Sequence, residues 1–433
     1  MCSQPNIDKF NEHPTFDNGC IERFFNSNKE NFNKQPIFNI GMLGSVSDGK
    51  STCVKETTGT KTQRHTSEQT KNITIKQGYA NIKIWFNPET KEYYSTNGDT
   101  KNHIVDGVEC QLIHQLSFID CPGHQDLIRI MMGCINLMHG VIVVVAANDP
   151  IDKKPQLIQH LAAIEKAGIT NVIVCLNKLD LITKEQSLEK YSDLKKLLQR
   201  YNIKPKAIIP VSFSRGLNTE EVLKSIIKNF SFVPETDDGP PIFMATRSFN
   251  INRQGIPFNE VQGGVIGGSL INGTLKVGDV IEIKPGICKK GRNFPFTTKI
   301  TSLKSDNTSL DCILPGGLIG IGTELDPYFC SDDQMSGQII GLAGTLPEVV
   351  NSITLNYTIV NDFGCNWNPK VDDSVYLQIG TNSIESKVTQ FDDRTMTFNL
   401  SKAACIVGGS NIMISYKEDS IIKIAAIGSV ILE

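Results

Sequence analysis

Apolar residues follow two different patterns, one before and one after residue 235. Before it, short runs of consecutive apolar residues alternate with segments of helical spacing, and the runs contain no regular polar positions. Such uninterrupted runs are typical of strands that are buried on both faces, as in a parallel sheet. The predicted strands cover residues 38–43, 116–119, 141–147, 172–176 and 208–211.

Two helices are predicted between these strands. One begins at Lys50 and stops at Gly59, because glycine favours the conformation that ends a helix. The other repeats apolar residues at helical spacing between positions 157 and 164 and ends at Gly168. Strands that alternate with helices predict a doubly wound, mostly parallel α/β sheet.

After residue 235 the chain consists of short β-rich stretches that are separated by glycine turns. Examples are residues 263–271, 280–283, 318–321, 353–359, 395–400 and 412–416. This pattern predicts β-barrels or sandwiches. Proline and glycine near residue 240 and at Pro347 mark two boundaries, and the Asn-rich start reads as a disordered tail. The expected domains are therefore a tail at 1–35, then 36–235, 236–346 and 347–433.

Composition narrows the class of protein. The chain has 433 residues, of which 39% are hydrophobic and 21% charged, and its net charge is −3. This balance excludes a global polyelectrolyte for nucleic acid, so RNA contacts are expected only at a local patch. One candidate patch contains Lys284, Lys289, Lys290 and Arg292, although a solvated loop has the same composition.

The apolar runs and cysteines indicate the compartment. The longest strongly apolar run, residues 140–147, is too short to span a bilayer, and no secretory signal is evident at the N-terminus. The 12 cysteines include no Cys-x-x-Cys pair, and most lie in apolar runs. We therefore expect a cytoplasmic protein that has buried thiols, no zinc and no membrane partner.

The first chemical motif, residues 44–51, reads GSVSDGKS and fits G-x-x-x-x-G-K-[ST]. It follows a predicted strand and opens a predicted helix, so backbone N–H groups and the helix N-terminus would hold a phosphate. Lys50 is expected at the β- and γ-phosphates, and Ser51 at Mg²⁺. The predicted contacts in this loop are Gly44, Ser47, Asp48, Gly49, Lys50, Ser51 and Thr52.

The second motif is Asp120-Cys121-Pro122-Gly123-His124, at the end of another predicted strand. Asp120 is expected to hold Mg²⁺ through a water, and Gly123 to turn its N–H toward a γ-phosphate. His124 is then placed to orient the attacking water. The alternative for His124 is an ordinary hydrogen-bonded loop histidine.

The third motif is Asn177-Lys178-Leu179-Asp180, again after a strand of the parallel type. A carboxylate there accepts hydrogen bonds from both N1 and N2 of guanine, and adenine offers no such pair of donors. Lys178 is expected to lie across the purine face. Ser212, after the last strand of this region, would support the base with its backbone N–H.

Thr74 is the fourth candidate. Its hydroxyl and carbonyl groups would close on Mg²⁺ and the γ-phosphate when GTP is bound and let go after hydrolysis. The alternative is a threonine in an ordinary β-strand.

Together these motifs resemble those of the translational GTPases, and most of all those of the gamma subunit of eukaryotic and archaeal translation initiation factor 2. Residues 72–76 and 78–81, NITIK and GYAN, are similar to its switch region. Residues 247–249, 263–268 and 315–320 are similar to its second domain, and residues 338–347 to the junction with its third. The resemblance is clear over residues 36–350.

The resemblance implies a fold, an activity and partners. The expected fold is a P-loop GTPase domain followed by two β-barrel domains. The expected activity is hydrolysis of GTP to GDP and phosphate, with Mg²⁺, at a rate that is slow without a partner protein. The expected partners are aminoacylated initiator tRNA, the small ribosomal subunit, alpha- and beta-type subunits, and nucleotide-exchange and GTPase-activating factors. The cleft between the switch region and residues 244–268 would take the aminoacylated end.

The sequence departs from the family pattern at several positions. Ser45 and Asp48 stand where the family's phosphate loop has histidines, and Asp48 is unfavourable beside phosphates unless Lys50 or Mg²⁺ compensates its charge. Phe213 replaces a small residue and is expected to crowd the guanine edge. The family's cysteine-rich knuckle would fall at residues 86–113, where Cys110 alone remains.

Two other functions fit parts of this pattern. Asp48 and Phe213 favour an adaptor or decoy that keeps the fold and its partner binding but has little GTPase activity. An elongator-type tRNA carrier, such as a selenocysteine-specific factor, shares the nucleotide motifs, but residues 72–76 and 315–347 favour the initiation factor.

Overall fold

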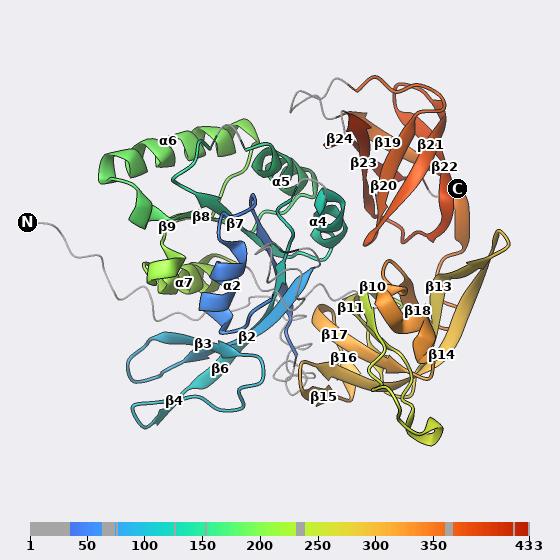
Figure 1. Ribbon diagram of the computed structural model, residues 1–433, viewed down its shortest axis with the longest axis horizontal. Helices are drawn as coiled ribbons and strands as arrows, with labels where there is room; N and C mark the ends of the chain where they lie inside the picture. Colours follow the sequence, from blue (N-terminus) through green and yellow to red (C-terminus); the bar gives the residue numbers. More distant parts are fainter. Residues whose placement is uncertain are drawn as a thin grey trace, which may run out of the picture.

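The computed structural model describes residues 35–62, 74, 77–124, 127–151, 154–230, 239–359, 367–418 and 421–431. Residues 1–34 of the predicted tail lie outside the described part. In Figure 1 the blue-to-green part of the chain forms an α/β sandwich, and the yellow and red parts form two β-barrels beside it. This arrangement confirms the predicted fold class.

The first sheet has seven strands in the order β3-β2-β6-β1-β7-β8-β9. The five strands from β6 to β9 are parallel, and β2 and β3 run antiparallel at one edge. All six residues of β1 and all seven of β7 are buried, as their mostly apolar sequences predict. The bounds are β1 Phe38–Leu43, β2 Gly78–Phe86, β3 Tyr93–Asn97, β6 Gln111–Asp120, β7 Gly140–Ala146, β8 Val172–Asn177 and β9 Ala207–Pro210.

Helices cover both faces of this sheet. Val141, Val143 and Val145 of β7 pack in a cluster with α4, α5 and α6, whereas the alternate residues Ile142 and Val144 pack with α2 and α7. The bounds are α2 Lys50–Thr58, α4 Ile128–Ile135, α5 Pro155–Lys166, α6 Lys184–Arg200 and α7 Thr219–Asn229. Helices α2 and α5 agree with the two predicted helices, and Gly59 closes α2 in the left-handed conformation.

The second sheet closes into a barrel in the order β13-β18-β10-β11-β17-β14, with β14 pairing back to β13 and β15 added at its side. The bounds are β10 Ile242–Phe249, β11 Val265–Asn272, β13 Val280–Lys289, β14 Arg292–Ser305, β15 Thr308–Leu310, β17 Gly316–Thr323 and β18 Ile339–Leu342. Lys284 is buried in this barrel and donates to the carbonyl oxygen of Leu346 at 3.1 Å, so it does not belong to an exposed basic patch.

The third sheet is a closed barrel in the order β19-β22-β21-β20-β23-β24. Its bounds are β19 Val349–Ile359, β20 Ser374–Ile379, β21 Asn382–Phe391, β22 Thr395–Cys405, β23 Asn411–Glu418 and β24 Ile421–Val430. Smaller elements are β4 Ile104–Val105, β5 Val108–Glu109, β12 Leu275–Lys276, β16 Cys312–Ile313 and the 3-10 helices Leu179–Leu181, Phe213–Arg215, Phe258–Glu260 and Pro327–Asp333. We propose domain limits at the predicted positions near residues 235 and 346.

Both barrels pack against the α/β sandwich. Asn39 of β1 donates to the hydroxyl of Ser269 in the second sheet at 3.1 Å. Gln159 of α5 donates to the carbonyl oxygen of Ile422 in the third sheet at 2.8 Å. The guanidinium of Arg129 lies 4.6 Å from the ring centre of Tyr376. These contacts place the second sheet beside β1 and the third sheet beside α4 and α5.

The cysteines that lie in apolar runs are buried, as those runs predict. The thiols of Cys121, Cys134, Cys175 and Cys405 are buried and form no disulfide. Within the described residues, none of the helices combines the length and the apolar character that crossing a bilayer requires.

Candidate nucleotide site

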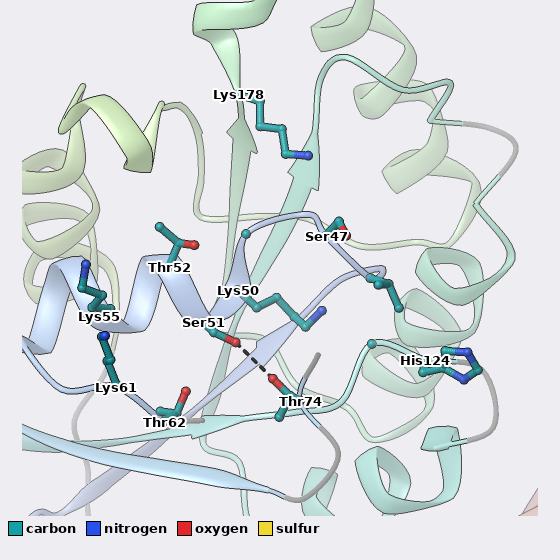
Figure 2. Close-up of a pocket in the computed structure, with 13 residues that line it drawn as sticks. Ser47, Lys50, Ser51, Thr52, Lys55, Lys61, Thr62, Thr74, His124 and Lys178 are labelled. Carbon is teal, nitrogen blue, oxygen red and sulfur yellow. Dashed lines mark hydrogen bonds between the residues drawn. The ribbon is translucent and has the colours of Figure 1, made fainter. Parts of the chain in front are cut away.

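A cavity of about 650 Å³ opens at the carboxyl ends of β1, β6 and β8. Ligands of open α/β sheets bind at this end of the strands. Figure 2 shows its lining side chains, which come from the loops after these strands, from α2, and from three described residues between α2 and β2. The lining residues are Val46, Ser47, Gly49, Lys50, Ser51, Thr52, Lys55, Lys61, Thr62, Thr74, Gly123, His124 and Lys178.

The loop between β1 and α2 curls around the mouth of this cavity. Ser47 and Gly49 both have positive φ, 63° and 102°, so the loop turns in a way that exposes consecutive backbone N–H groups. A side chain at Gly49 would collide with the amide of Asn177. Helix α2 begins at Lys50 with no acidic residue in its first turn, so its N-terminus favours an anion.

Lys50 lies in the middle of the cavity wall. Its ammonium donates to the carbonyl oxygens of Gly44 and Ser45 at 3.0 and 2.8 Å. Burial lowers the pKa of Lys50, and the nearby carboxylates of Asp120 and Asp48 oppose this shift. A cation with this position and few water contacts interacts strongly with a polyphosphate.

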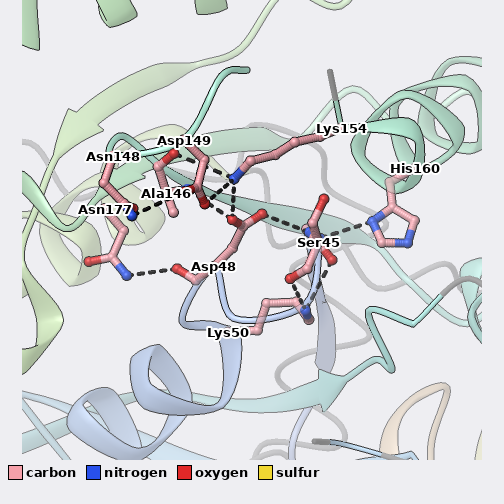
Figure 3. Close-up of polar contacts among 10 residues, drawn as sticks. Ser45, Asp48, Lys50, Ala146, Asn148, Asp149, Lys154, His160 and Asn177 are labelled. Carbon is pink, nitrogen blue, oxygen red and sulfur yellow. Dashed lines mark hydrogen bonds and ion pairs between the residues drawn. The ribbon is translucent and has the colours of Figure 1, made fainter. Parts of the chain in front are cut away.

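Asp48 is the first residue at which the structure departs from expectation. Its carboxylate is fully buried behind the loop, and it pairs with Lys154 at 2.5 Å. The sequence pointed to Lys50 or Mg²⁺ as the compensating charge. Lys154 makes this contact, and Figure 3 shows it beside Asp48.

The three predicted Mg²⁺ ligands lie in or next to the cavity. The Ser51 Oγ and Thr74 Oγ1 atoms are 3.1 Å apart. Asp120 is buried at the end of β6, and its Oδ2 accepts a 2.6 Å hydrogen bond from Thr62, which lines the cavity. Hard oxygen donors of this kind suit Mg²⁺, which takes one or two protein ligands and the phosphates. The donor set therefore fits Mg²⁺.

No set of three His, Cys, Asp or Glu side chains that could hold a metal occurs in the described residues. The backbone N–H of Cys110 donates to the carbonyl oxygen of His103 at 2.9 Å, and aromatic side chains of β2 and β3 lie beside the His103 ring. The rings of Trp85 and Tyr94 lie 6.1 and 5.5 Å from that of His103.

Gly123 and His124 lie on the wall opposite α2. A Cβ atom at Gly123 would press on the ammonium of Lys50 and lie 2.9 Å from the carbonyl carbon of Ser45. Glycine therefore allows this segment to approach the phosphate loop. The His124 side chain is exposed at the cavity edge, and in Figure 2 its ring points away from Lys50 and Thr74.

The Asn177–Asp180 segment reaches the same cavity from β8. Asn177 donates to the carbonyl oxygen of Asp48 at 2.8 Å, and Lys178 adopts a positive φ of 64° and lines the cavity. Asp180 accepts a 2.6 Å hydrogen bond from the Ser212 hydroxyl. The Ser212 N–H donates to the carbonyl oxygen of Leu217 at 3.2 Å, so Ser212 supports Asp180 instead of presenting its N–H to a base.

Phe213 does not crowd the cavity, contrary to the sequence-based expectation. Its ring is 1% exposed and packs in the core beneath β8 and α7, while its N–H donates to Asn177 at 3.2 Å. The loop after β9 turns the ring inward, and no pattern in the sequence reveals that direction.

Besides Lys154, four supporting residues were missed from sequence. They are Lys55, Lys61 and Thr62 on the cavity wall, and His160, whose Nδ1 accepts the N–H of Gly44 at 3.0 Å. A signal existed for His160 alone, because it interrupts the apolar face of α5 between Leu157 and Ile164. Burial lowers its pKa to about 3, so its imidazole is neutral and accepts this bond.

Comparisons with known proteins decide the family. The segment 35–231 matches the family described as "Elongation factor Tu GTP binding domain". The chain is 37% identical to eukaryotic translation initiation factor 2 subunit gamma of Encephalitozoon cuniculi, over 89% of this chain and 90% of that protein. It is 36% identical to translation initiation factor 2 subunit gamma of Methanocaldococcus jannaschii, over 92% and 98%. The chain belongs to the family of translation initiation factor 2 gamma subunits. Like that family, it is a GTPase.

Solved structures show the same fold in more distant proteins. A bacterial selenocysteine-specific elongation factor, EF-Sec, aligns with a TM-score of 0.70 and 20% identity over 91% of this chain. The aligned region covers 58% of that elongation factor, which is longer than this chain. The elongation factor SelB from Methanococcus maripaludis, in complex with the GTP analogue GPPNHP, aligns with a TM-score of 0.67 and 18% identity over 92% of this chain and 79% of its own. These likenesses concern the fold.

Proposed function

We propose that this protein binds GTP with Mg²⁺ and carries aminoacylated initiator tRNA to the small ribosomal subunit, with GTP hydrolysis as the release step. One observation carries the proposal: Thr74 and Gln77, two described residues just before β2, contact the nucleotide cavity and the second domain respectively. Residues 72, 73, 75 and 76 of the predicted switch region lie outside the described residues. Thr74 lines the cavity, and Gln77, three residues later, accepts a hydrogen bond from Arg247 of β10 at 3.3 Å.

Arg247 is held rigidly at this junction. Its Nε donates to Asp333 at 2.8 Å, and its guanidinium lies 5.2 Å from the centre of the Phe249 ring. Gln77 also contacts α4, because its side chain donates to the carbonyl oxygen of Ile130 at 3.4 Å. A shift of Thr74 on GTP binding would therefore be transmitted through Gln77 to the second domain and to α4.

A second, smaller cavity lies at this junction. Its volume is about 150 Å³, and β2 supplies one wall while β10, β11 and β17 supply the others. Arg247 and Asn81 provide polar groups, and Tyr79 and Phe249 provide apolar surface. This mixture suits an aminoacylated RNA end, which presents a base, a ribose and a side chain. We therefore propose this cavity as the place where the aminoacylated end contacts the protein.

In this proposal, each residue of the nucleotide cavity has its own role in binding or hydrolysing GTP. Lys50 neutralises the β- and γ-phosphates, and Asp180 selects guanine while Lys178 lies along the purine. Ser51, Thr74 and Asp120 would hold Mg²⁺, which would neutralise phosphate charge. Gly123 gives its N–H to the γ-phosphate, and His124 orients water. Because the His124 ring points away from Lys50 in Figure 2, we expect slow hydrolysis until a partner protein turns it inward.

Binding of tRNA in the two nucleotide states tests the proposal. A switch transmits information only if its ligand distinguishes GTP from GDP. We expect methionylated initiator tRNA to bind at least about tenfold more tightly with a non-hydrolysable GTP analogue than with GDP. Equal affinities in a filter-binding assay would refute the carrier function. Elongator tRNA serves as the control and would bind more weakly.

The structure removes the two reasons, Asp48 and Phe213, for expecting an adaptor or decoy with little GTPase activity. Asp48 is neutralised by Lys154, and the Phe213 ring is buried in the core. Alpha- and beta-type subunits, exchange factors, GTPase-activating factors and a cytoplasmic location belong to the proposal. Co-purification of tagged protein from cells tests these partners.

A further inference from the structure

A buried ion pair lies directly behind the phosphate loop, outside the nucleotide cavity. The Asp48 carboxylate is 0% exposed, and its Oδ1 atom meets the ammonium of Lys154 at 2.5 Å. Lys154 comes from the loop between β7 and α5, 106 residues away in sequence. Neither residue lines the cavity. The pair therefore acts on the loop and makes no direct contact with the nucleotide.

Asp48 fastens the loop at three points. Its Oδ2 accepts the N–H of Ser45 at 2.7 Å, which closes the loop on itself. Its Oδ1 accepts the N–H of Ala146 at 3.1 Å, which ties the loop to the end of β7. The third contact is Lys154, which also lies 3.4 Å from Asp149 and 3.5 Å from the carbonyl oxygen of Ala146. Figure 3 shows these contacts converging on Asp48.

Helix α5 supplies a second anchor to the same loop. His160 accepts the N–H of Gly44, so the loop is held at its first glycine by α5 and at Asp48 by the residue that precedes α5. The loop is thus held at both ends by contacts within the chain. A preformed loop reduces the ordering cost of binding and lengthens the residence time of the ligand.

We infer that Asp48 and Lys154 form a positioning pair that sets nucleotide affinity, which deepens the proposed function at the same site. Lys154 does two things at once. It holds the carboxylate that shapes the loop, and it cancels a negative charge next to the place where the phosphates bind. Removing Lys154 alone leaves a buried, uncompensated carboxylate behind the phosphates, whereas removing both charges together leaves neither strain nor repulsion.

A double-mutant cycle tests the inference, with dissociation of a fluorescent GDP analogue as the readout. We expect Lys154→Met to release GDP about tenfold faster than the native protein, and the double variant D48N/K154M to release it within about threefold of the native rate. Asp48→Asn alone should have a smaller effect than Lys154→Met, because Lys154 keeps Asp149 and the Ala146 carbonyl group. Lys154→Arg should restore slow release.

The control is Lys196→Met on α6, which removes a cation from an exposed pair with Asp193 at 3.5 Å and should leave release unchanged. Circular dichroism of each variant ensures that rates are compared between folded proteins. If Lys154→Met does not fold, the double variant and Asp48→Asn still carry the test. Native-like release by Lys154→Met, or equally fast release by the single and double variants, would overturn the inference. Failure of the native protein to bind GDP would instead refute the proposed function.

Discussion

The side-chain amide of Asn177 donates a 2.8 Å hydrogen bond to the backbone carbonyl oxygen of Asp48. This bond joins the loop that holds the phosphates to the segment that recognises the base, although the two are 129 residues apart. The same amide accepts the N–H of Phe213 through its oxygen, so three loops meet at one side chain. Their relative positions, and hence the spacing between phosphate and base sites, depend on Asn177.

Asn177→Ala should therefore weaken binding of both GTP and GDP. The substitution leaves a buried carbonyl and a buried N–H without partners, which costs about 1–3 kcal/mol for each group. Isothermal titration would show a loss of affinity for both nucleotides with little change in their ratio. A selective loss of GTP would contradict a role in spacing the loops.

Asp180→Asn should change the choice of base. The native carboxylate accepts hydrogen bonds from N1 and N2 of guanine, whereas an amide both donates and accepts. Xanthine carries an oxygen in place of the guanine amino group and so suits the amide. We expect GTP affinity to fall by about 2 kcal/mol or more and affinity for xanthosine triphosphate to rise. Competition between the two nucleotides measures the exchange of preference.

Gly123→Ala should slow hydrolysis more than it weakens GDP binding. The added Cβ would press on Lys50 and lie 2.9 Å from the Ser45 carbonyl carbon, so the segment has to withdraw from the γ-phosphate. GDP lacks that phosphate and depends less on the approach. Single-turnover hydrolysis should fall at least about tenfold, which corresponds to 1.36 kcal/mol in the barrier. Parallel GDP titrations provide the comparison.

Arg247→Ala should uncouple tRNA binding from the bound nucleotide. The substitution removes the hydrogen bond to Gln77 and the ion pair with Asp333. Movement of Thr74 is then no longer transmitted through Arg247 to the second domain. The affinity ratio between the GTP and GDP states should approach one, while nucleotide affinity itself changes little. Arg394→Ala in the third domain is the matched control and should keep the native ratio.

Acid should destabilise the α/β domain through two histidines that serve as acceptors. Burial lowers the pKa of His160 to about 3 and that of His139 to about 4, and both Nδ1 atoms accept backbone N–H groups at the two ends of β1. Because the unfolded state binds protons first, their stabilisation is full above pH 6.5 and declines as the pH falls toward the folded-state values. At pH 5, protonation linked to His160 alone should lower the free energy of unfolding by about 2 kcal/mol relative to neutral pH.

Urea unfolding at pH 7 and pH 5 measures this loss. His160→Gln keeps an oxygen that can accept the Gly44 N–H but cannot charge, so its stability should depend less on pH. An unchanged pH dependence in this variant would contradict the assignment of His160.

The elements that could be predicted from sequence are those in which the pattern of apolar residues follows the pattern of burial. Strands β1, β7 and β8 are mostly apolar because helices cover both faces, and the motifs after β1 and β8 could be placed at one edge of the sheet. Helix α4 escaped prediction because six of its eight residues are buried and no polar face marks its period. Helix α6 is mostly polar, although its capping box of Thr183 and Gln186 was a usable signal.

The supporting contacts of the site were beyond prediction because they depend on tertiary geometry. The direction of the Phe213 ring follows from the turn after β9, and the Asp48–Lys154 contact joins residues whose loops meet in the folded chain alone. Sequence motifs identify atoms that touch a ligand. They do not identify the residues that hold those atoms in place.

The pairing of Asp48 with Lys154 also constrains how this protein can evolve. An acid at position 48 is tolerated where a cation already stands at position 154, so the lysine would have to arise first or together with the acid. Related chains that carry aspartate or glutamate at the equivalent of position 48 should then also carry lysine or arginine at the equivalent of position 154. Chains that lack the acid should be free to vary there, and this covariation can be counted in any sufficiently broad collection of sequences.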